Sequence, residues 1–550
     1  MRKTNALRST NAIVATGQGE AGATGRWAGR SKGSRTLKRV LVALGTVVTV
    51  VIALVGGGFA WLWTGADVST VGKGSFTNEL VIPSLAEPTR VKANGTKVFD
   101  LDMRAGEREF RPGKPTRTWG FNGAYLGPTL RAERGDKVEV RVRNSLDEPS
   151  TVHWHGMHLP ARMDGGPHQM VDPGGVWSPH WTIDQPAATL WYHPHPHGRT
   201  ERHVQRGLAG MFLVDDKKSS SLPLPKRYGV DDLPVIVQDV KFDGAQFDYQ
   251  HGLMQSVGFL GDRTMVNGTL DPYREVRDEL VRLRLLNAST ARVYSFGFDD
   301  NRRYAQIATD GGLLERPVQT DRLQLSPGER AEIVVRVRPG ERTTLRSFPQ
   351  DYGDAWNTRF GGGDDSFDIL QLRAAATLRP SPALPKRLGA LEVPDGSDAT
   401  RARFFELKKS GINGRKMAMD RVDETITRGV TETWTVRNNN GMPHNFHVHD
   451  VQFRVLEVNG RTPPPQLRGR KDTVFLPNGT TMKLAMRFDG PADPNTPYMY
   501  HCHLLSHEDQ GMMGQFVVVE EGAKPGQPAG SAQHTHEGGS SGPSNGTAGR

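Results

Sequence analysis

The sequence is almost free of cysteine, with a single one, Cys502, in 550 residues. A lone cysteine excludes an intrachain disulfide, so packing and any bound metal must hold the folded part together. A lone cysteine is usually an inert, buried side chain. Here it stands between two histidines, in the motif His501-Cys502-His503. This placement favours a metal ligand.

The sequence also lacks an excess of positive charge beyond its N-terminal segment. The net charge is +10, but residues 1–64 contain nine Lys and Arg and one Glu, which leaves only +2 for residues 65–550. A domain that binds nucleic acid needs a basic face, and this balance supplies none. We therefore expect no nucleic acid partner.

Residues 40–63 lack charged side chains altogether, which makes them long enough and apolar enough to cross a bilayer as a helix. Residues 1–39 are polar and basic, so we expect them to be disordered and, by the positive-inside rule, cytoplasmic. The rest of the chain would then lie on the extracytoplasmic side, anchored to the membrane. Cleavage of a long signal, which would release a secreted protein, is the alternative.

Helix-period patterns are sparse, whereas 63 Gly and 36 Pro separate many short apolar runs, which favours an all-β chain. An Asn-Gly turn followed by an alternating strand that ends at Asn occurs three times, with the final residues Asn144, Asn287 and Asn438. These repeats predict three β-sandwich domains. We place the domains at residues 78–220, 230–375 and 400–520, followed by a disordered tail at 521–550.

Four His-x-His pairs occur in the first and third repeats. His153 lies nine residues after Asn144, and His447 lies nine residues after Asn438. The corresponding offset in the middle repeat holds Phe296, so we expect that repeat to be a spacer without ligands. The four pairs are His153/His155, His193/His195, His447/His449 and His501/His503.

Strand geometry makes each pair point at one place, because residues i and i+2 share a face. Eight imidazoles from two related domains therefore predict a multi-metal cluster between those domains. The same alternation sends Cys502 to the opposite face, where we expect it to meet His444, His507 and Met512. Two metal sites would thus be joined by adjacent residues.

The donor set decides the metal. Imidazole and thiolate also suit zinc, which is the nearest alternative. Eight inward imidazoles beside a site with Cys, two His and a weak axial Met exceed what a zinc site needs, and they favour copper.

Together these motifs resemble the three-domain multicopper oxidase family, which includes laccases, bilirubin oxidases and bacterial cuprous oxidases, over roughly residues 78–520. The resemblance implies three consecutive cupredoxin-like Greek-key β-sandwich domains and four copper ions. It assigns His444, Cys502, His507 and Met512 to the type 1 copper, and His153 and His447 to the type 2 copper. It assigns His155, His193 and His503 to one type 3 copper, and His195, His449 and His501 to the other.

The family's activity follows from the same resemblance. Four one-electron oxidations at the type 1 copper are coupled to the reduction of dioxygen to two water molecules at the three-copper cluster. Electrons would pass from Cys502 through the backbone to His501 or His503. By resemblance to bacterial cuprous oxidases, Asp164 and Glu508 occupy the positions of the acids that supply protons.

The electron donor is less well defined by the sequence. We expect a laccase-like oxidase that acts on phenols or aromatic amines, with a metal oxidase for Cu(I), Fe(II) or Mn(II) in copper tolerance as the alternative. Cuprous oxidases of the family commonly carry a Met-rich insert, and residues 350–400 contain no Met. Some proteins with this fold are division-associated factors that have lost their copper ligands, but every ligand position is filled here. Six further histidines receive no role: His158, His168, His180, His197, His203 and His251.

Overall fold

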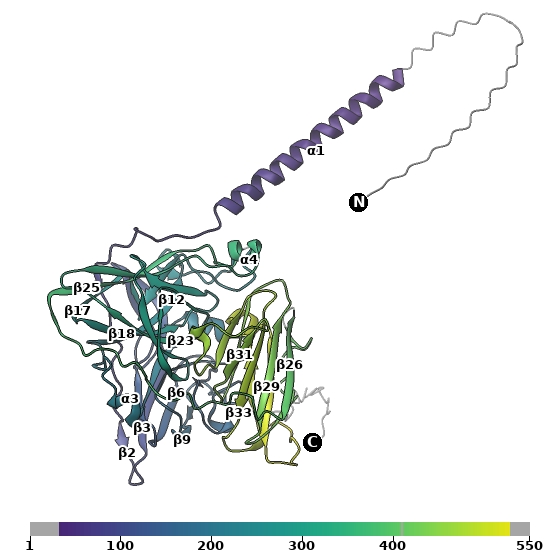
Figure 1. The fold of residues 1–550 in the computed structure, drawn as a ribbon. Helices are drawn as coiled ribbons and strands as arrows, with labels where there is room; N and C mark the ends of the chain where they lie inside the picture. The colour runs from purple at the N-terminus through teal and green to yellow at the C-terminus, as the bar shows by residue number, and fades with distance from the viewer. Residues whose placement is uncertain (1–31, 253, 409–410, 529–550) are drawn as a thin grey trace, which may run out of the picture. The chain divides into compact units, whose positions relative to one another are not determined.

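The computed structural model describes residues 32–252, 254–408 and 411–528. By its internal contacts the chain divides into two compact units, Met1–Thr64 and Gly65–Arg550. The described part of the first unit is one helix, and the second unit is built mainly of β-strands (Figure 1). We predicted disorder for residues 1–39 and 521–550, of which residues 1–31 and 529–550 lie outside the described residues. Residues 32–39 are instead the first turns of a helix, because they continue into the apolar segment.

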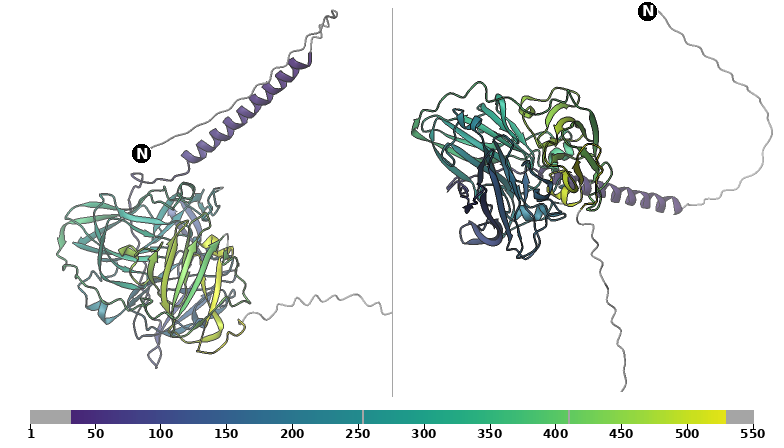
Figure 2. Two further views of the ribbon diagram at one scale, coloured as in Figure 1. Left: turned by 45° about the vertical axis from the view of Figure 1, so that its right-hand side comes forward. Right: turned by 90° about the horizontal axis from the view of Figure 1, so that it is seen from below.

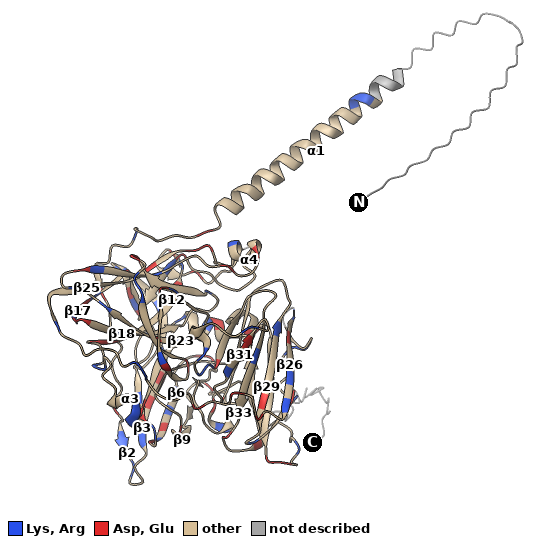
Figure 3. Ribbon diagram, in the orientation of Figure 1, with Lys and Arg blue, Asp and Glu red and all other residues tan. Residues whose placement is uncertain are grey.

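Helix α1 (Lys32–Thr64) contains the uncharged segment and begins eight residues before it. Its apolar stretch, Leu37–Thr64, is 28 residues long with a mean hydropathy of 2.6, which is sufficient to cross a membrane. The hydroxyl groups of Thr46 and Thr49 donate to the carbonyl groups four residues earlier, so the helix satisfies its own polar side chains. In Figure 3 the coloured part of α1 is tan except for a short blue stretch toward its N-terminal end.

The first pair of sheets encloses a core in which Val138, Val140 and Val142 alternate with outward-facing residues of β6. One sheet has the order β2 (Arg90–Val91), β3 (Lys97–Arg111), β6 (Lys137–Asn144) and β8 (Val176–Trp177), with β4 (Lys114–Phe121) on β3 and β9 (His180–Thr182) on β6. The other has the order β5 (Leu130–Glu133), β11 (Gly210–Asp215), β10 (Ala188–His193) and β7 (His153–His155).

The second pair of sheets encloses a core that includes Val281, Leu283 and Leu285 of β18. One sheet has the order β16 (Thr269–Leu270), β15 (Arg263–Val266), β12 (Asp232–Val240), β18 (Leu280–Asn287), β23 (Arg330–Arg336), β20 (Tyr304–Thr309) and β21 (Gly312–Thr320). The other has the order β1 (Asn78–Glu79), β17 (Pro272–Asp278), β25 (Phe367–Arg379), β24 (Arg342–Ser347), β19 (Tyr294–Phe298) and β22 (Leu323–Leu325).

The third pair of sheets, green to yellow in Figure 2, encloses a core around Trp434 and Val436 of β29. One sheet has the order β27 (Gly411–Ile412), β26 (Arg401–Lys408), β29 (Thr431–Asn438), β33 (Thr481–Arg487) and β31 (Arg454–Val458). The other has the order β28 (Glu424–Thr427), β35 (Met513–Val519), β34 (Asp493–His501), β30 (His444–Val448) and β32 (Thr473–Leu476).

Short elements connect these strands. They are the hairpin β13 (Phe242–Asp243) and β14 (Gln246–Phe247), the helices α2 (Thr200–Gln205), α3 (Lys217–Ser221), α4 (Ala355–Phe360) and α5 (Leu505–Asp509), and the 3-10 turns η1 (Ala161–Met163) and η2 (Pro465–Leu467).

The three repeats have the same local structure. In each, the strand that ends at the repeated Asn runs parallel to an earlier strand of its sheet: β6 to β3, β18 to β12 and β29 to β26. Asn144, Asn287 and Asn438 are buried, and each side-chain amide donates to two backbone carbonyl groups. The repeated Asn thus locks the end of its strand.

The asparagines of the three Asn-Gly turns are also equivalent. Asn122, Asn267 and Asn413 all have positive φ, between 51° and 59°, a conformation that Asn tolerates better than most residues. The side-chain oxygen of each accepts from a backbone N–H of a neighbouring strand. The predicted all-β fold with one apolar N-terminal helix is confirmed. The domain limits stay a prediction, and β1, at residues 78–79, pairs with β17 of the second pair of sheets.

Candidate metal centre

Four strands bring the His-x-His pairs together. His153 lies opposite His193 where β7 pairs with β10, and His447 lies opposite His501 where β30 pairs with β34. The second histidine of three of the pairs lies one or two residues beyond the end of its strand. All eight histidines are at most 1% exposed, although their rings are polar and are not part of an apolar core. Strands of the first and third pairs of sheets therefore build one buried imidazole cluster.

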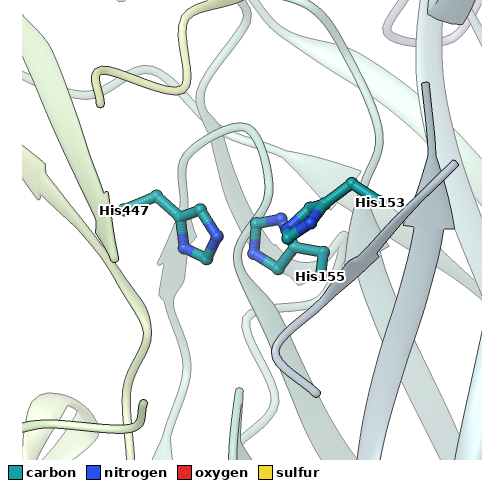
Figure 4. Close-up of side chains that lie close together, drawn as sticks. All are labelled: His153, His155 and His447. Carbon is teal, nitrogen blue, oxygen red and sulfur yellow. The ribbon is translucent and has the colours of Figure 1, made fainter. Parts of the chain in front are cut away.

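The first group in the cluster consists of His153, His155 and His447, whose ring nitrogens lie within 4.8 Å of one another. Figure 4 shows the three rings pointing toward each other, His447 from β30 and the other two from β7. The Nε2 atoms of His153 and His447 have no hydrogen-bond partner among the described residues. Buried nitrogens of this kind are costly unless they bind something, so they fit a metal ion.

Two further groups match the predicted type 3 sets: His155, His193 and His503, and His195, His449 and His501. In the second, His501 Nε2 lies 3.2 Å from the Nε2 atoms of both His195 and His449. In the first, His193 Nε2 lies 3.4 Å from His155 Nδ1. Tetrahedral ligands about 2 Å from a metal lie roughly 3.3 Å apart, so these separations fit ligands around a metal ion.

The cysteine belongs to a separate group. Cys502 Sγ lies 3.5 Å from His444 Nδ1 and 3.6 Å from His507 Nδ1, and the two nitrogens are 3.0 Å apart. His507 Nε2 donates to the Ser256 carbonyl group, which leaves Nδ1 as the free ligand atom. Met512 is fully buried in the same apolar core as Cys502. Burial raises the pKa of the Cys502 thiol to about 12, so a bound cation is needed to form the thiolate.

Asp164 and Glu508, which we predicted to lie near the cluster, each face two of its histidines. Asp164 Oδ2 lies 2.7 Å from His449 Nδ1, and its Oδ1 lies 3.4 Å from His153 Nδ1. Glu508 lies 3.3 Å from His195 Nδ1 and 3.1 Å from His501 Nδ1. A carboxylate at Nδ1 holds the proton there and directs Nε2 toward the metal.

A third carboxylate, Asp472, was not predicted. Its Oδ1 lies 3.2 Å from His155 Nε2, and its carbonyl oxygen accepts from His447 Nδ1 at 2.9 Å. Arg330 donates two hydrogen bonds of 2.7 Å to this carboxylate. No sequence motif marks either residue, because they are 142 positions apart and Arg330 belongs to β23 of the repeat expected to be a spacer. The middle repeat, through Arg330, therefore positions one edge of the cluster.

Burial keeps six of the cluster histidines neutral by lowering their pKa. It lowers the pKa of His195 and of His503 to about 3, and it holds the pKa of His155, His193, His447 and His449 well below the usual value. Neutral imidazole is the metal-binding form, so the site is ready to bind metal at neutral pH.

The histidines without a predicted role lie apart from these groups. His203 is buried between Ser150, at 3.0 Å, and Glu148, at 2.7 Å. His168 contacts Gln515 at 2.8 Å, and His251 contacts Glu201 at 3.0 Å. His158 is partly buried, and His180 and His197 are exposed.

Comparison with known proteins gives consistent matches. Residues 102–219 and 381–522 match two family models, each described as multicopper oxidase. A multicopper oxidase of Staphylococcus haemolyticus is 35% identical over 80% of this chain and 93% of its own length. The solved structure of CueO, a laccase-like multicopper oxidase from Ochrobactrum sp., is 36% identical, with a TM-score of 0.72 over 80% of this chain and all of that one.

A relative with a different described role matches equally well. The cell division protein FtsP of Escherichia coli is 38% identical over 80% of this chain and 92% of its own length. Overall similarity therefore does not separate an oxidase from a division protein, and the ligand groups have to decide between them.

Proposed function

The chain belongs to the multicopper oxidase family, and we propose on this basis that it is an enzyme that couples four one-electron oxidations of an external donor to the reduction of dioxygen to two water molecules. Copper is the metal of this family, and the buried histidine groups fit it. The observation that carries the proposal is that the three consecutive residues 501–503 belong to three different ligand groups. Cys502 belongs to one ligand group, while His501 and His503 belong to two others.

We assign four copper ions to these groups. His444, Cys502, His507 and Met512 would hold the type 1 ion, and His153 with His447 the type 2 ion. The two remaining groups of three histidines would each hold one type 3 ion. When bound, copper supplies one-electron redox chemistry, taking single electrons from the donor and delivering four to dioxygen.

The chain between the two sites is short and rigid. Asn445 Oδ1 accepts from the His503 N–H and lies 3.6 Å from Cys502 Sγ. The Asn445 amide in turn donates to the Pro327 carbonyl group, which fixes its orientation. Asn445 therefore holds the thiol and the histidine backbone in one arrangement, and we propose that electrons cross here.

Asp164 and Glu508 would hold protons at the cluster. Both are only 1% exposed and contact histidines from two different strands. Burial alone would raise the pKa of Glu508, but the adjacent His195 and His501 outweigh it and hold this pKa well below its usual value. Glu508 is thus an anion at neutral pH, and it would take up a proton from solvent and pass it to the cluster, where four-electron reduction consumes four protons.

Phenols and aromatic amines are the donors we propose. The Ochrobactrum sp. protein is described as active towards lignin model compounds and lignosulfonate, which supports the same class here. We propose that electrons from such a donor enter through the His507 ring, which is 4% exposed and whose Nε2 donates to the Ser256 carbonyl group on the side away from Cys502 Sγ and the Nδ1 atom.

Helix α1 would anchor this enzyme in the membrane. Its large apolar side chains are exposed in the described chain, Leu41 by 61% and Leu54 by 70%. Such exposure is unfavourable in water and favourable in a bilayer, which both a membrane anchor and a signal segment enter. We propose an uncleaved anchor with the catalytic sandwiches on the extracytoplasmic side.

Oxygen uptake by the copper-loaded full chain in non-ionic detergent tests the function. With a methoxyphenol as donor we expect four donor molecules to be oxidised per dioxygen, and Cys502→Ser should lose both this activity and the blue absorption. Oxygen uptake when Cu(I), Fe(II) or Mn(II) is the donor, together with no uptake when a phenol is the donor, would identify a metal oxidase. A fully copper-loaded protein that consumes no oxygen with any donor would overturn the oxidase and favour a role like that of FtsP.

A further inference from the structure

A cavity of about 310 Å³, here called the junction cavity, lies away from the imidazole cluster and contains none of its ligands. It forms where the loop before β10, helix α3, the start of β21, the segment 388–392 and the segment before β32 meet. Its charged lining residues are Arg134, Asp216, Lys217, Lys218, Glu392 and Arg470. Figure 3 shows α3, which carries the two lysines, in blue.

Arg470 is the unusual member of this lining. It is only 6% exposed, yet its guanidinium makes no hydrogen bond or ion pair with any described residue. Its backbone is held in place, because the Arg470 carbonyl oxygen accepts from Thr309 Oγ1 and from the Gly311 N–H. Only the carboxylates of Glu392 and Asp216 act on this guanidinium, at longer range, and it lines the cavity, where the oxygens of a ligand could accept from its five N–H donors.

The acidic residues nearby do not neutralise the cavity. The Asp216 carboxylate already accepts from the backbone N–H groups of Ala187 and Ser219. Glu392 is exposed and lies 3.9 Å from Lys218, outside normal hydrogen-bond distance. Four cationic side chains face two acidic ones, so the lining carries two uncompensated positive charges.

We propose that the junction cavity binds a small dianion that carries phosphate or carboxylate groups, such as a phosphate monoester or a dicarboxylate. The planar guanidinium of Arg470 would bind one oxyanion group bidentately, and Arg134 and the lysines would bind the second charge. The volume is larger than a single phosphate ion needs, which favours an organic anion.

The cavity connects to the metal centre through two residues. Lys471 forms ion pairs with Asp310 and Glu329, and Asp472 contacts His155. An anion on Arg470 would therefore hold the segment that carries Asp472, without touching a copper ligand. Anion binding is measured without turnover. Absence of binding would therefore overturn only the proposed anion site, and absence of oxygen uptake would overturn only the proposed oxidase.

Calorimetric titration of the copper-loaded full chain in non-ionic detergent, at about 0.1 M NaCl, tests the site. The probes are glycerol phosphate and succinate. We expect saturable binding of at least one of them at one molecule per chain, and the stronger arm identifies phosphate or carboxylate as the preferred group. Arg470→Met should weaken this binding at least about tenfold.

Arg468→Met is the matched control, because Arg468 is exposed two residues away and does not line the cavity; it should bind like the parent. If Arg470→Met does not fold, the exposed Lys217→Gln and Arg134→Gln decide, and both should weaken binding. Absence of saturable binding of either anion would overturn the proposal. Unchanged affinity in the cavity variants would overturn it as well.

Discussion

Individual carboxylates organise the imidazole cluster. Asp164, Glu508 and Asp472 each contact two of its histidines, so six of the eight rings are oriented by three acids. Three buried carboxyl groups would also offset part of the charge that copper ions bring into the buried site. Each acid therefore affects both ring orientation and metal affinity.

Asp472→Asn should lower copper affinity at the cluster by about 10- to 100-fold, because the amide no longer orients His155 and leaves Arg330 without its buried partner. The blue absorption of the Cys502 site should persist. Copper content per chain and the blue absorption provide the measurement. Asp489→Asn, at an exposed acid paired with Arg487, is the control. Full copper content in the Asp472 variant would contradict this role.

Asp164→Asn should slow oxygen reduction while it leaves the blue absorption unchanged. The amide can still contact His449, but it cannot hold or release a proton. Reoxidation of the donor-reduced enzyme by dioxygen, followed at the blue band, gives the rate. An unchanged rate would show that Asp164 has no part in proton supply.

His203 gives the fold a defined acid sensitivity. Burial lowers its pKa to about 4, whereas an unfolded chain has an ordinary histidine pKa of about 6.5. Between these values the unfolded state binds one more proton than the folded state, so stability falls as the pH falls from about 6.5 to about 4.

His203→Gln should make that fall shallower by about one proton, because glutamine keeps a polar contact to Glu148 but does not titrate. Urea unfolding of the copper-loaded protein at several pH values measures the slope. An identical pH dependence in parent and variant would exclude this contribution.

The turn between β34 and α5 connects the two proposed metal sites. β34 ends at His501, and α5 begins four residues later, so the turn between them carries Cys502 and His503. The prediction that Cys502 and its two neighbours would face different ligand groups agrees with the groups the structure forms. β30 and β34 pair in regular register up to His447 and His501, whereas Cys502 and His503 follow the end of β34, so the turn and not strand alternation sets their directions.

Helix α1 is separable from the β-rich unit by its contacts. Deletion of residues 1–64 should therefore move the protein from the membrane fraction to the soluble fraction, with copper content and specific activity within about twofold of the parent. Carbonate extraction of membranes measures the partition. If expression of the full-length gene gives a soluble protein whose N-terminus lies near residue 65, α1 is instead a cleaved signal.

The whole molecule depends on charges buried between its sandwiches. Arg330 of the middle repeat binds Asp472, and Lys471 binds Asp310 and Glu329 of the middle repeat. These groups are at most 2% exposed, so each would be costly without its partner. The middle repeat, which the sequence suggested was a spacer, is also the scaffold for one wall of the cluster.

Copper removal should lower the thermal unfolding midpoint by several degrees, because ions that bind only the folded state stabilise it by mass action. The buried Nε2 atoms of His153 and His447 would also lose their partner. Calorimetric scans before chelation, after chelation and after copper is restored provide the test. A midpoint that copper does not change would contradict the assignment of these groups as metal ligands.

The sequence by itself determined the all-β fold, the apolar helix and the histidines that we propose as ligands, because strand period, turn chemistry and an internal repeat are local patterns. Cys502 and the His-x-His pairs could be placed because each lies at a fixed offset from a repeated Asn or within one strand. Only the tertiary structure decided the role of Asp472, the contribution of Arg330 and the unpaired guanidinium of Arg470. The contacts of Asp472 with Arg330 and with His155 join side chains more than 100 residues apart in a buried region. Burial sets the energies of such polar groups, and it leaves no local signal in the sequence.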